Sequence, residues 1–149
     1  MKKIFLLVLC SVVVLSCSTT KGYKSVNERD VPERYVKDMT KQHPNVEKRT
    51  WDMVDSTSYN VNFTNNGTQM RIKYQKASTE TSWIVPTEYI PSQITDYVKQ
   101  NYPESKLGEV AIVDVKNKKA YYATISSNKG TKVLEFDLTG AFTSEVINK

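Results

Sequence analysis

Residues that carry catalytic or metal-binding chemistry are scarce in this sequence. Among its 149 residues there are one histidine, His43, and two cysteines, Cys10 and Cys17, both near the amino terminus. Structural zinc sites combine several Cys and His ligands, so this supply excludes them. The five glycines are scattered and form no phosphate-binding loop. We therefore expect no metal and no cofactor, and we expect that the protein is not an enzyme.

The charge balance does not favour nucleic acid as a partner. The net charge is +5, with 21 Lys and Arg against 16 Asp and Glu, and the lysines are scattered along the chain. Nucleic-acid binding would need a clustered basic patch. Charged residues make up 25% of the chain and aromatic residues 10%, which is typical of a folded domain rather than a disordered segment.

The first seventeen residues have the pattern of a secretory signal. Lys2 and Lys3 precede an apolar run over residues 4–15, which is too short to span a bilayer but fits the core of a signal peptide. The run ends in Val14-Leu15-Ser16-Cys17, and this small residue before a cysteine resembles the lipobox of bacterial lipoproteins. An ordinary cleaved signal peptide is the alternative.

The lipobox resemblance implies a signal peptide over residues 1–16, cleavage between Ser16 and Cys17, and acylation of Cys17. Acyl chains anchor a protein to a membrane that it does not span. Ser18 rather than Asp follows the cysteine, and in proteins of this kind that implies an outer-membrane anchor, here on the periplasmic face. Residues 17–30 are polar and aperiodic, so we expect a lipidated flexible tether there.

The stretch over residues 31–44 recurs over residues 90–103. Pro32 corresponds to Pro91 and Pro44 to Pro103, each at a separation of 59 residues. A recurrence of this kind indicates two copies of one supersecondary unit. We place the first unit at residues 31–85 and the second at residues 90–149.

Each unit is predicted to open with a short helix. Proline fits the first turn of a helix, and Pro44 and Pro103 end the two helices because the residue before a proline avoids the helical region. His43 corresponds to Tyr102, so we interpret it as a helix terminus rather than a ligand. One apolar stripe runs along each helix, formed by Val31, Tyr35, Val36 and Met39 in the first and by Ile90, Ile94, Tyr97 and Val98 in the second.

Four strands are predicted to follow each helix. Residues 59–64 and 121–126 alternate between apolar and polar side chains, as in a strand with one buried face. Asn66-Gly67 and Asn128-Lys129-Gly130 predict tight turns after these strands. Earlier turns are expected at residues 55–56 and 117–118, and further strands near residues 47–54, 81–85, 109–115 and 142–147. The predicted class is α+β, with two tandem helix-plus-four-stranded antiparallel meanders.

These features resemble the PepSY-like family of envelope proteins, which is related in fold to the β-lactamase-inhibitor protein. The residues that carry the resemblance are Val31-Pro32 and Ile90-Pro91 at the helix starts, His43-Pro44 at a helix end, Trp51, and the hairpin at Gly67. The resemblance implies one curved sheet with both helices on its convex side. It also implies that the concave face is the one that binds, as in the inhibitor protein.

One face of the predicted sheet is polar but carries an aromatic residue. Tyr and Arg are common anchors of protein interfaces, so this face is a candidate surface for binding a partner; a plain solvated surface is the alternative. Five tyrosines on apolar stripes are assigned to the core instead, namely Tyr35, Tyr59, Tyr74, Tyr97 and Tyr121, whereas Trp51 fits either face. The residues of the candidate surface are Asn60, Asn62, Arg71, Lys73, Tyr122 and Thr124.

The resulting hypothesis is a non-catalytic, monomeric envelope lipoprotein that binds an unknown protein or peptide through its sheet face, as an inhibitor or a sensor. Two alternatives remain open. One is a hydrolase that works through carboxylates, because the scattered acidic residues cannot be paired from sequence. The other is a structural envelope protein without a cognate ligand.

Overall fold

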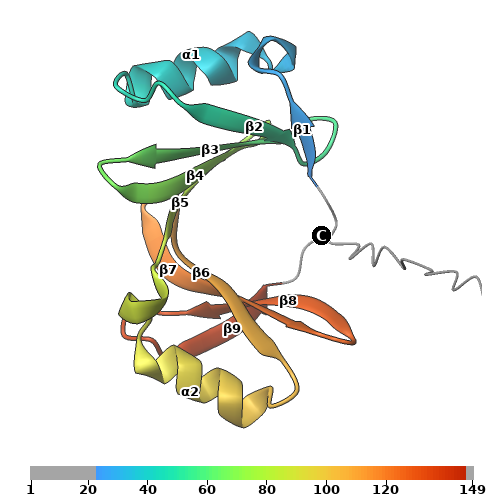
Figure 1. Ribbon diagram of the computed structural model, residues 1–149, viewed down its shortest axis with the longest axis vertical. Helices are drawn as coiled ribbons and strands as arrows, with labels where there is room; N and C mark the ends of the chain where they lie inside the picture. Colours follow the sequence, from blue (N-terminus) through green and yellow to red (C-terminus); the bar gives the residue numbers. More distant parts are fainter. Residues whose placement is uncertain (1–22, 147–149) are drawn as a thin grey trace, which may run out of the picture.

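The computed structural model describes residues 23–146 (Figure 1). The first half contains β1 (Lys24–Val26), the 3-10 helix η1 (Glu28–Asp30), α1 (Glu33–Gln42), β2 (Arg49–Met53), β3 (Tyr59–Asn65), β4 (Thr68–Tyr74) and β5 (Thr79–Ile84). The second half contains the 3-10 helix η2 (Thr87–Tyr89), α2 (Ser92–Asn101), β6 (Lys106–Val115), β7 (Lys118–Ser127), β8 (Gly130–Phe136) and β9 (Phe142–Val146). Within residues 23–146, neither helix is long and apolar enough to cross a membrane.

All nine strands join in one antiparallel sheet, in the order in which they occur along the chain. The α+β class is therefore confirmed. Pairing of β5 with β6, from Glu80 opposite Val115 to Ile84 opposite Ala111, makes the sheet continuous between the two halves. In Figure 1 the sheet bends between its ends, with α1 beside the first strands and α2 beside the last.

The two helices form where the proline pattern predicts them. Pro32 and Pro91 are the N-cap residues of α1 and α2. At the other end, the backbone N–H of His43 donates to Met39 O at 2.9 Å, so His43 closes α1 as interpreted. The helices bury Tyr35 and Met39 in α1 and Ile94 and Val98 in α2, all from the predicted apolar stripes, as expected of amphipathic helices.

The tight turns follow from residues that tolerate positive φ. Asn66 (φ 49°) and Gly67 (φ 80°) join β3 to β4, as predicted. Another turn of the second half, between β6 and β7, was predicted at residues 117–118. It lies one residue earlier, at Lys116 (φ 53°) and Asn117 (φ 65°), because Lys118 already pairs with Val115.

Two hydrophobic clusters form the core, one in each half. Both contain the buried residues of a helix and of the strands next to it. The tyrosines assigned to the core are confirmed there, since Tyr35, Tyr59 and Tyr74 are buried in the first cluster and Tyr97 and Tyr121 pack against the second. The first cluster contains Val31, Tyr35, Met39, Val46, Trp51, Tyr59, Val61, Phe63, Met70, Ile72 and Tyr74, and the second contains Ile94, Val98, Val110, Ala123, Ile125, Leu134 and Phe136.

Trp51, which the sequence left undecided, belongs to the core. Its side chain is 2% exposed, and its indole Nε1 donates to Glu28 Oε2 at 2.8 Å. The same carboxylate accepts from Nε of Arg49 and, at 2.9 Å, from its Nη2. Glu28 in η1 is thereby held against β2 by two side chains.

The tether predicted over residues 17–30 is wrong for residues 24–30. Residues 24–26 form β1, paired with Trp51, Asp52 and Met53 of β2, and residues 28–30 form η1. The polar composition did not predict β1, because Lys24-Ser25-Val26 has only one apolar residue. The strand forms by pairing with β2, which lies far along the chain. The predicted signal peptide, the cleavage site at Ser16 and Cys17, and residues 17–22 lie outside the described part of the structure.

Candidate binding face

The sheet has one face toward the hydrophobic clusters and one face away from them. Successive residues of a strand point to opposite faces, and residues directly opposite each other on neighbouring strands share a face. Val61 and Ile72, which are paired, face the first cluster. Asn60, Asn62 and their partners therefore lie on the other face, which we call the polar face.

All six residues of the predicted surface lie on the polar face. Asn60 is opposite Lys73, and Asn62 is opposite Arg71. In the second half, the β6–β7 and β7–β8 registers place Tyr122 opposite Ala111 and Thr124 opposite Val133. The register thus brings together residues from both halves on one surface.

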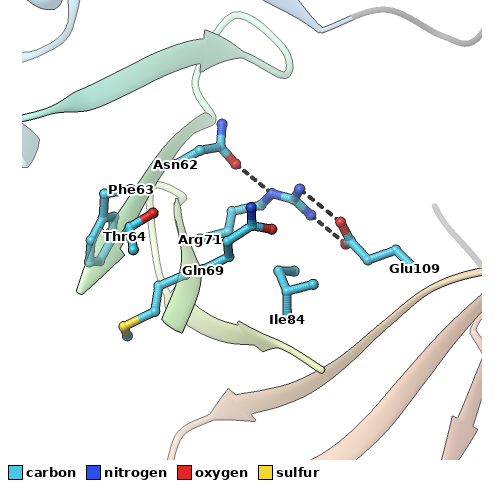
Figure 2. Close-up of a pocket in the computed structure, with 8 residues that line it drawn as sticks. Asn62, Phe63, Thr64, Gln69, Arg71, Ile84 and Glu109 are labelled. Carbon is cyan, nitrogen blue, oxygen red and sulfur yellow. Dashed lines mark hydrogen bonds and ion pairs between the residues drawn. The ribbon is translucent and has the colours of Figure 1, made fainter. Parts of the chain in front are cut away.

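A chain of hydrogen bonds crosses the polar face from β2 to β6. Asn62 Nδ2 donates to Asp52 Oδ2 at 2.8 Å, and Arg71 Nε donates to Asn62 Oδ1 at 2.8 Å. The Arg71 guanidinium then meets Glu109 with Nη1 to Oε1 at 2.9 Å and Nη2 to Oε2 at 3.3 Å. Figure 2 shows Arg71 between Asn62 and Glu109, at the side of a pocket of about 320 Å³. The bidentate pair joins the first half to the second.

Glu109 is a residue of this face that sequence reasoning missed. The β6–β7 register shifts between Leu107 and Val110, so Gly108 and Glu109 lie in a bulge. Alternation along β6 places Glu109 on the same face as Ala111 and Val113, so extending the pattern along this strand could have found it. Because Glu109 neutralises Arg71, the cation that the sequence assigned to a free binding surface is already paired.

A groove of about 210 Å³ lies over the middle of the polar face, and we call it the central groove. Five of the six predicted residues line it, namely Asn60, Arg71, Lys73, Tyr122 and Thr124, whereas Asn62 lines the neighbouring pocket. Residues Ala111 and Val113 of β6 are buried and line it too. Sequence reasoning missed the following lining residues: Tyr23, Glu80, Ser82, Glu109, Ala111, Val113, Val133 and Val146.

Strand alternation could have found some of the missed residues. Glu80 and Ser82 follow from extending the alternation across β5, since Glu80 is opposite Lys73 and Ser82 is opposite Arg71. Tyr23 could not be found in this way because it precedes β1, in a segment predicted to be a tether. Its place in the groove depends on the pairing of β1 with β2.

Searches against protein-family models and against curated proteins find no match. Among solved structures, a BLIP-like (β-lactamase-inhibitor-protein-like) protein from Bacteroides fragilis NCTC 9343 is 17% identical with a TM-score of 0.56, and the match covers 78% of this chain and 86% of that chain. A protein from Bacteroides eggerthii DSM 20697 that is described as periplasmic is 14% identical with a TM-score of 0.58, and the match covers 84% and 89% of the two chains.

This chain has a BLIP-like fold. The resemblance inferred from the sequence is therefore confirmed at the level of the fold. Identities of 14% and 17% do not extend this likeness to the side chains of the sheet.

Tyr122 is the aromatic residue of the central groove. Burial raises the pKa of its hydroxyl, and the carboxylates of Glu135 and Glu80 raise it further. The phenol is therefore neutral near pH 7. On the polar face, Tyr122 can offer both the face of its ring and its hydroxyl to a ligand.

Candidate groups for metal binding or catalysis do not converge in the described residues. Within residues 23–146, no group of three or more His, Cys, Asp or Glu side chains is placed to hold a metal ion. His43 packs against Phe63 with ring centroids 4.8 Å apart and ring planes tilted by 51°, and burial lowers the pKa of His43. On the polar face, Glu109 accepts a hydrogen bond from Arg71, and Asp52 accepts one from Asn62. These contacts are typical of residues that stabilise a sheet rather than of a catalytic acid–base pair.

Proposed function

We propose that this chain is a non-catalytic envelope lipoprotein that binds a protein or peptide through the polar face of its sheet, as an inhibitor or a sensor. The observation that carries the proposal is the central groove, which gathers an aromatic residue, apolar residues and charged residues from both halves. Protein interfaces combine an apolar centre with a polar rim in this way.

The arrangement of the sheet supports this choice of face. We propose that the two halves are repeats of one unit, fused into one curved sheet with both helices on the convex side. Each hydrophobic cluster contains its own helix together with strand residues opposite the polar face, and Figure 1 draws both helices outside the bend. On this arrangement the polar face is the concave one, and the helices leave it open.

An envelope location is proposed from two observations. The solved structure from Bacteroides eggerthii is described as periplasmic, and the sequence opens with a signal-like segment that ends at Cys17. We propose acylation of Cys17 and an anchor in the outer membrane on its periplasmic side. With β1 beginning at Lys24, few residues separate the acylated cysteine from the folded sheet, so the domain would lie close to the lipid surface.

Replacing Cys17 tests the proposed lipid anchor. The Cys17→Ser variant is expected to lose incorporation of a labelled fatty acid, because the acyl chain is transferred to this thiol. Cys10→Ser is the matched control, since it removes the other cysteine from within the signal segment and should leave labelling intact. Metabolic labelling in the native host measures both. Equal labelling of wild type and Cys17→Ser would contradict the anchor.

Site-specific crosslinking tests binding by the polar face. A photoreactive residue at Val133, which lines the central groove, is expected to capture a discrete partner in intact cells. Tyr122→Ala should reduce the adduct by about tenfold or more, as removal of a central aromatic anchor does. Tyr89→Ala is the matched control, because Tyr89 is 72% exposed in η2, away from the groove.

Two results would contradict this function. One is the absence of any discrete adduct at Val133 in cells that contain the correctly folded protein. The other is an adduct that Tyr122→Ala and Tyr89→Ala reduce equally. Thermal unfolding of both variants establishes that each retains the fold.

A further inference from the structure

The polar face has an apolar floor in the second half of the protein. Among residues 23–146, Ala111 and Val113 are the only buried hydrophobic residues that belong to neither hydrophobic cluster. They are 5% and 4% exposed, and both line the central groove. In the β6–β7 register they lie opposite Tyr122 and Ala120. Packing against the helices therefore does not explain why these two positions are apolar.

A second cavity, of about 490 Å³, extends this floor along β6 and β7, and we call it the β6–β8 pocket. It has the size of a small-ligand pocket. Val113 and Tyr122 line both the β6–β8 pocket and the central groove, so the two cavities adjoin. Val115 and Ala120 also line the pocket, and the short side chain of Ala120 leaves space on the same face as the ring of Tyr122. The other lining residues are Lys116, Lys118, Lys119, Glu135, Asp137 and Thr143.

The charges that surround this floor nearly cancel. The β6–β8 pocket is lined by three lysines and by the carboxylates of Glu135 and Asp137. One of these lysines, Lys119, has its Nζ 5.2 Å from the centroid of the Trp83 ring. Neither a cationic nor an anionic ligand therefore meets a clear excess of opposite charge. The central groove is lined by two cations and two carboxylates, namely Arg71, Lys73, Glu80 and Glu109.

The charged groups around the floor already have neighbours that offset them, besides the ion pair that joins the two halves. Glu80 lies opposite Lys73 in the β4–β5 register. On its other side Glu80 is opposite Val115, and Lys118 follows across that residue. Asp137 Oδ1 accepts two backbone N–H groups of its own turn, at 2.8 and 3.0 Å. A charged ligand would compete with these contacts, whereas an uncharged ligand would leave them intact.

An apolar floor inside a rim of balanced charge suits one kind of occupant. We propose that the β6–β8 pocket receives an uncharged apolar side chain of the partner, such as that of leucine or phenylalanine, lying over Val113 and Ala120 and against the ring of Tyr122. Removal of apolar surface from water favours this contact, and a charged side chain would lose its hydration there without gaining an opposite charge. Protein interfaces place apolar contacts at their centre and polar groups at their rim.

This inference rests on the function proposed above and deepens it, but it can fail separately. It states which side chain of the partner the polar face selects, whereas crosslinking at Val133 asks whether a partner is bound at all. A partner that is captured at Val133, and that still binds when the β6–β8 pocket is filled, would leave the function standing and overturn the apolar site.

The test uses short capped Gly-Ser peptides that differ at one central residue, which is Leu, Phe, Asn, Lys or Glu. Binding to the isotope-labelled full chain is followed through the amide signals of Val113, Ala120 and Tyr122. The Leu and Phe peptides are expected to bind about tenfold more tightly than the Asn peptide, because only an apolar side chain gains free energy by leaving water. Asn is the matched comparison for Leu, since the two side chains have similar shapes. Added salt is expected to leave the preference unchanged, because no charge is recognised.

A variant with a filled pocket completes the test. Ala120→Leu occupies the space beside Tyr122 and is expected to weaken binding of the Leu peptide about tenfold or more. Ala77→Leu adds the same atoms in the exposed turn between β4 and β5, which lines neither cavity, and is expected to change nothing. Lys118→Gln and Glu135→Gln change the charge of the rim and are each expected to alter binding less than about twofold.

Four results would overturn the proposal. They are binding of the Lys or Glu peptide as tight as that of the Leu peptide, no shift of the three amide signals with any peptide, unchanged binding of the Leu peptide to Ala120→Leu, and a tenfold loss in either charge variant. The peptide series on the unaltered chain decides the question even where Ala120→Leu does not fold.

Discussion

Ile72→Ala and Leu134→Ala are each expected to lower the free energy of unfolding by about 2–5 kcal/mol. Both side chains are 0% exposed, Ile72 in the first hydrophobic cluster and Leu134 in the second. Each truncation removes three carbon atoms and leaves a cavity, since the surrounding strands are held in register and cannot close around it. Urea denaturation followed by circular dichroism measures the loss.

The double variant tests how the two halves share stability. The two residues belong to separate clusters, so the losses are expected to add. A single unfolding transition is nevertheless expected, because β5 and β6 pair over five residue positions and join the halves. Two transitions would instead mean that each half unfolds by itself, and a strongly non-additive loss would mean that the clusters are coupled.

A surface leucine provides the control for these truncations. Leu138 is 57% exposed in the turn after β8, so Leu138→Ala removes the same atoms without opening a cavity. We expect it to change the free energy of unfolding by less than about 0.5 kcal/mol. A loss at Leu138 as large as that at Leu134 would contradict the placement of the second cluster.

Glu28→Gln is expected to destabilise the protein by about 1–3 kcal/mol, because it weakens charged hydrogen bonds from two side chains at once. Glu28 accepts from Arg49 and from the indole of Trp51. The Arg49 side chain is 16% exposed and would keep its charge with a weaker partner. Because the Glu28 side chain is itself 41% exposed, solvent screening keeps the loss below that of a fully buried pair.

The same carboxylate makes stability depend on pH. Hydrogen bonds from Arg49 lower the pKa of Glu28 below its ordinary value of 4.5, burial opposes this, and the bond from Trp51 and the charge of Arg49 lower it further. A carboxyl group with a lowered folded-state pKa stabilises the protein above its unfolded pKa. This contribution is therefore present above pH 4.5 and is lost as the pH falls through the lower folded value.

Glu33→Gln is the matched control for Glu28→Gln. Glu33 pairs with Lys37 at 2.7 Å on the surface of α1, and both side chains are more than 70% exposed. Its replacement is expected to cost less than about 0.5 kcal/mol, because exposed helix pairs contribute little. Unfolding midpoints measured between neutral and acidic pH compare the variants. If both substitutions have equal effects, or if the Glu28→Gln difference persists at low pH, the cluster does not stabilise the fold as described.

Local signals account for much of what could be predicted about the fold and the candidate site. Asn66-Gly67 specifies a turn because these two residues tolerate positive φ, and Pro32 and Pro91 mark helix starts because proline lacks an N–H. Alternation along β3 was enough to separate Asn60 and Asn62 from Val61. It assigned all six proposed surface residues to one face because side-chain alternation depends only on the strand itself.

The features that determine the chemistry of that face depend on pairing between distant segments. Glu109 of β6 pairs with Arg71 of β4, so the cation that alternation along β4 assigns to the polar face is not free. Likewise, β1 has too few apolar residues to be recognised and forms through its register with β2.

The sequence by itself determined the class of fold, the position of each helix, most turns, and which side chains share the polar face, because these depend on propensities and periods within short stretches. Tertiary structure alone decided that β5 joins β6, that the buried Trp51 donates to Glu28, and that the carboxylates of Glu80 and Glu135 act on Tyr122. Those contacts link residues far apart in the chain, and their free energies arise when the whole sheet assembles.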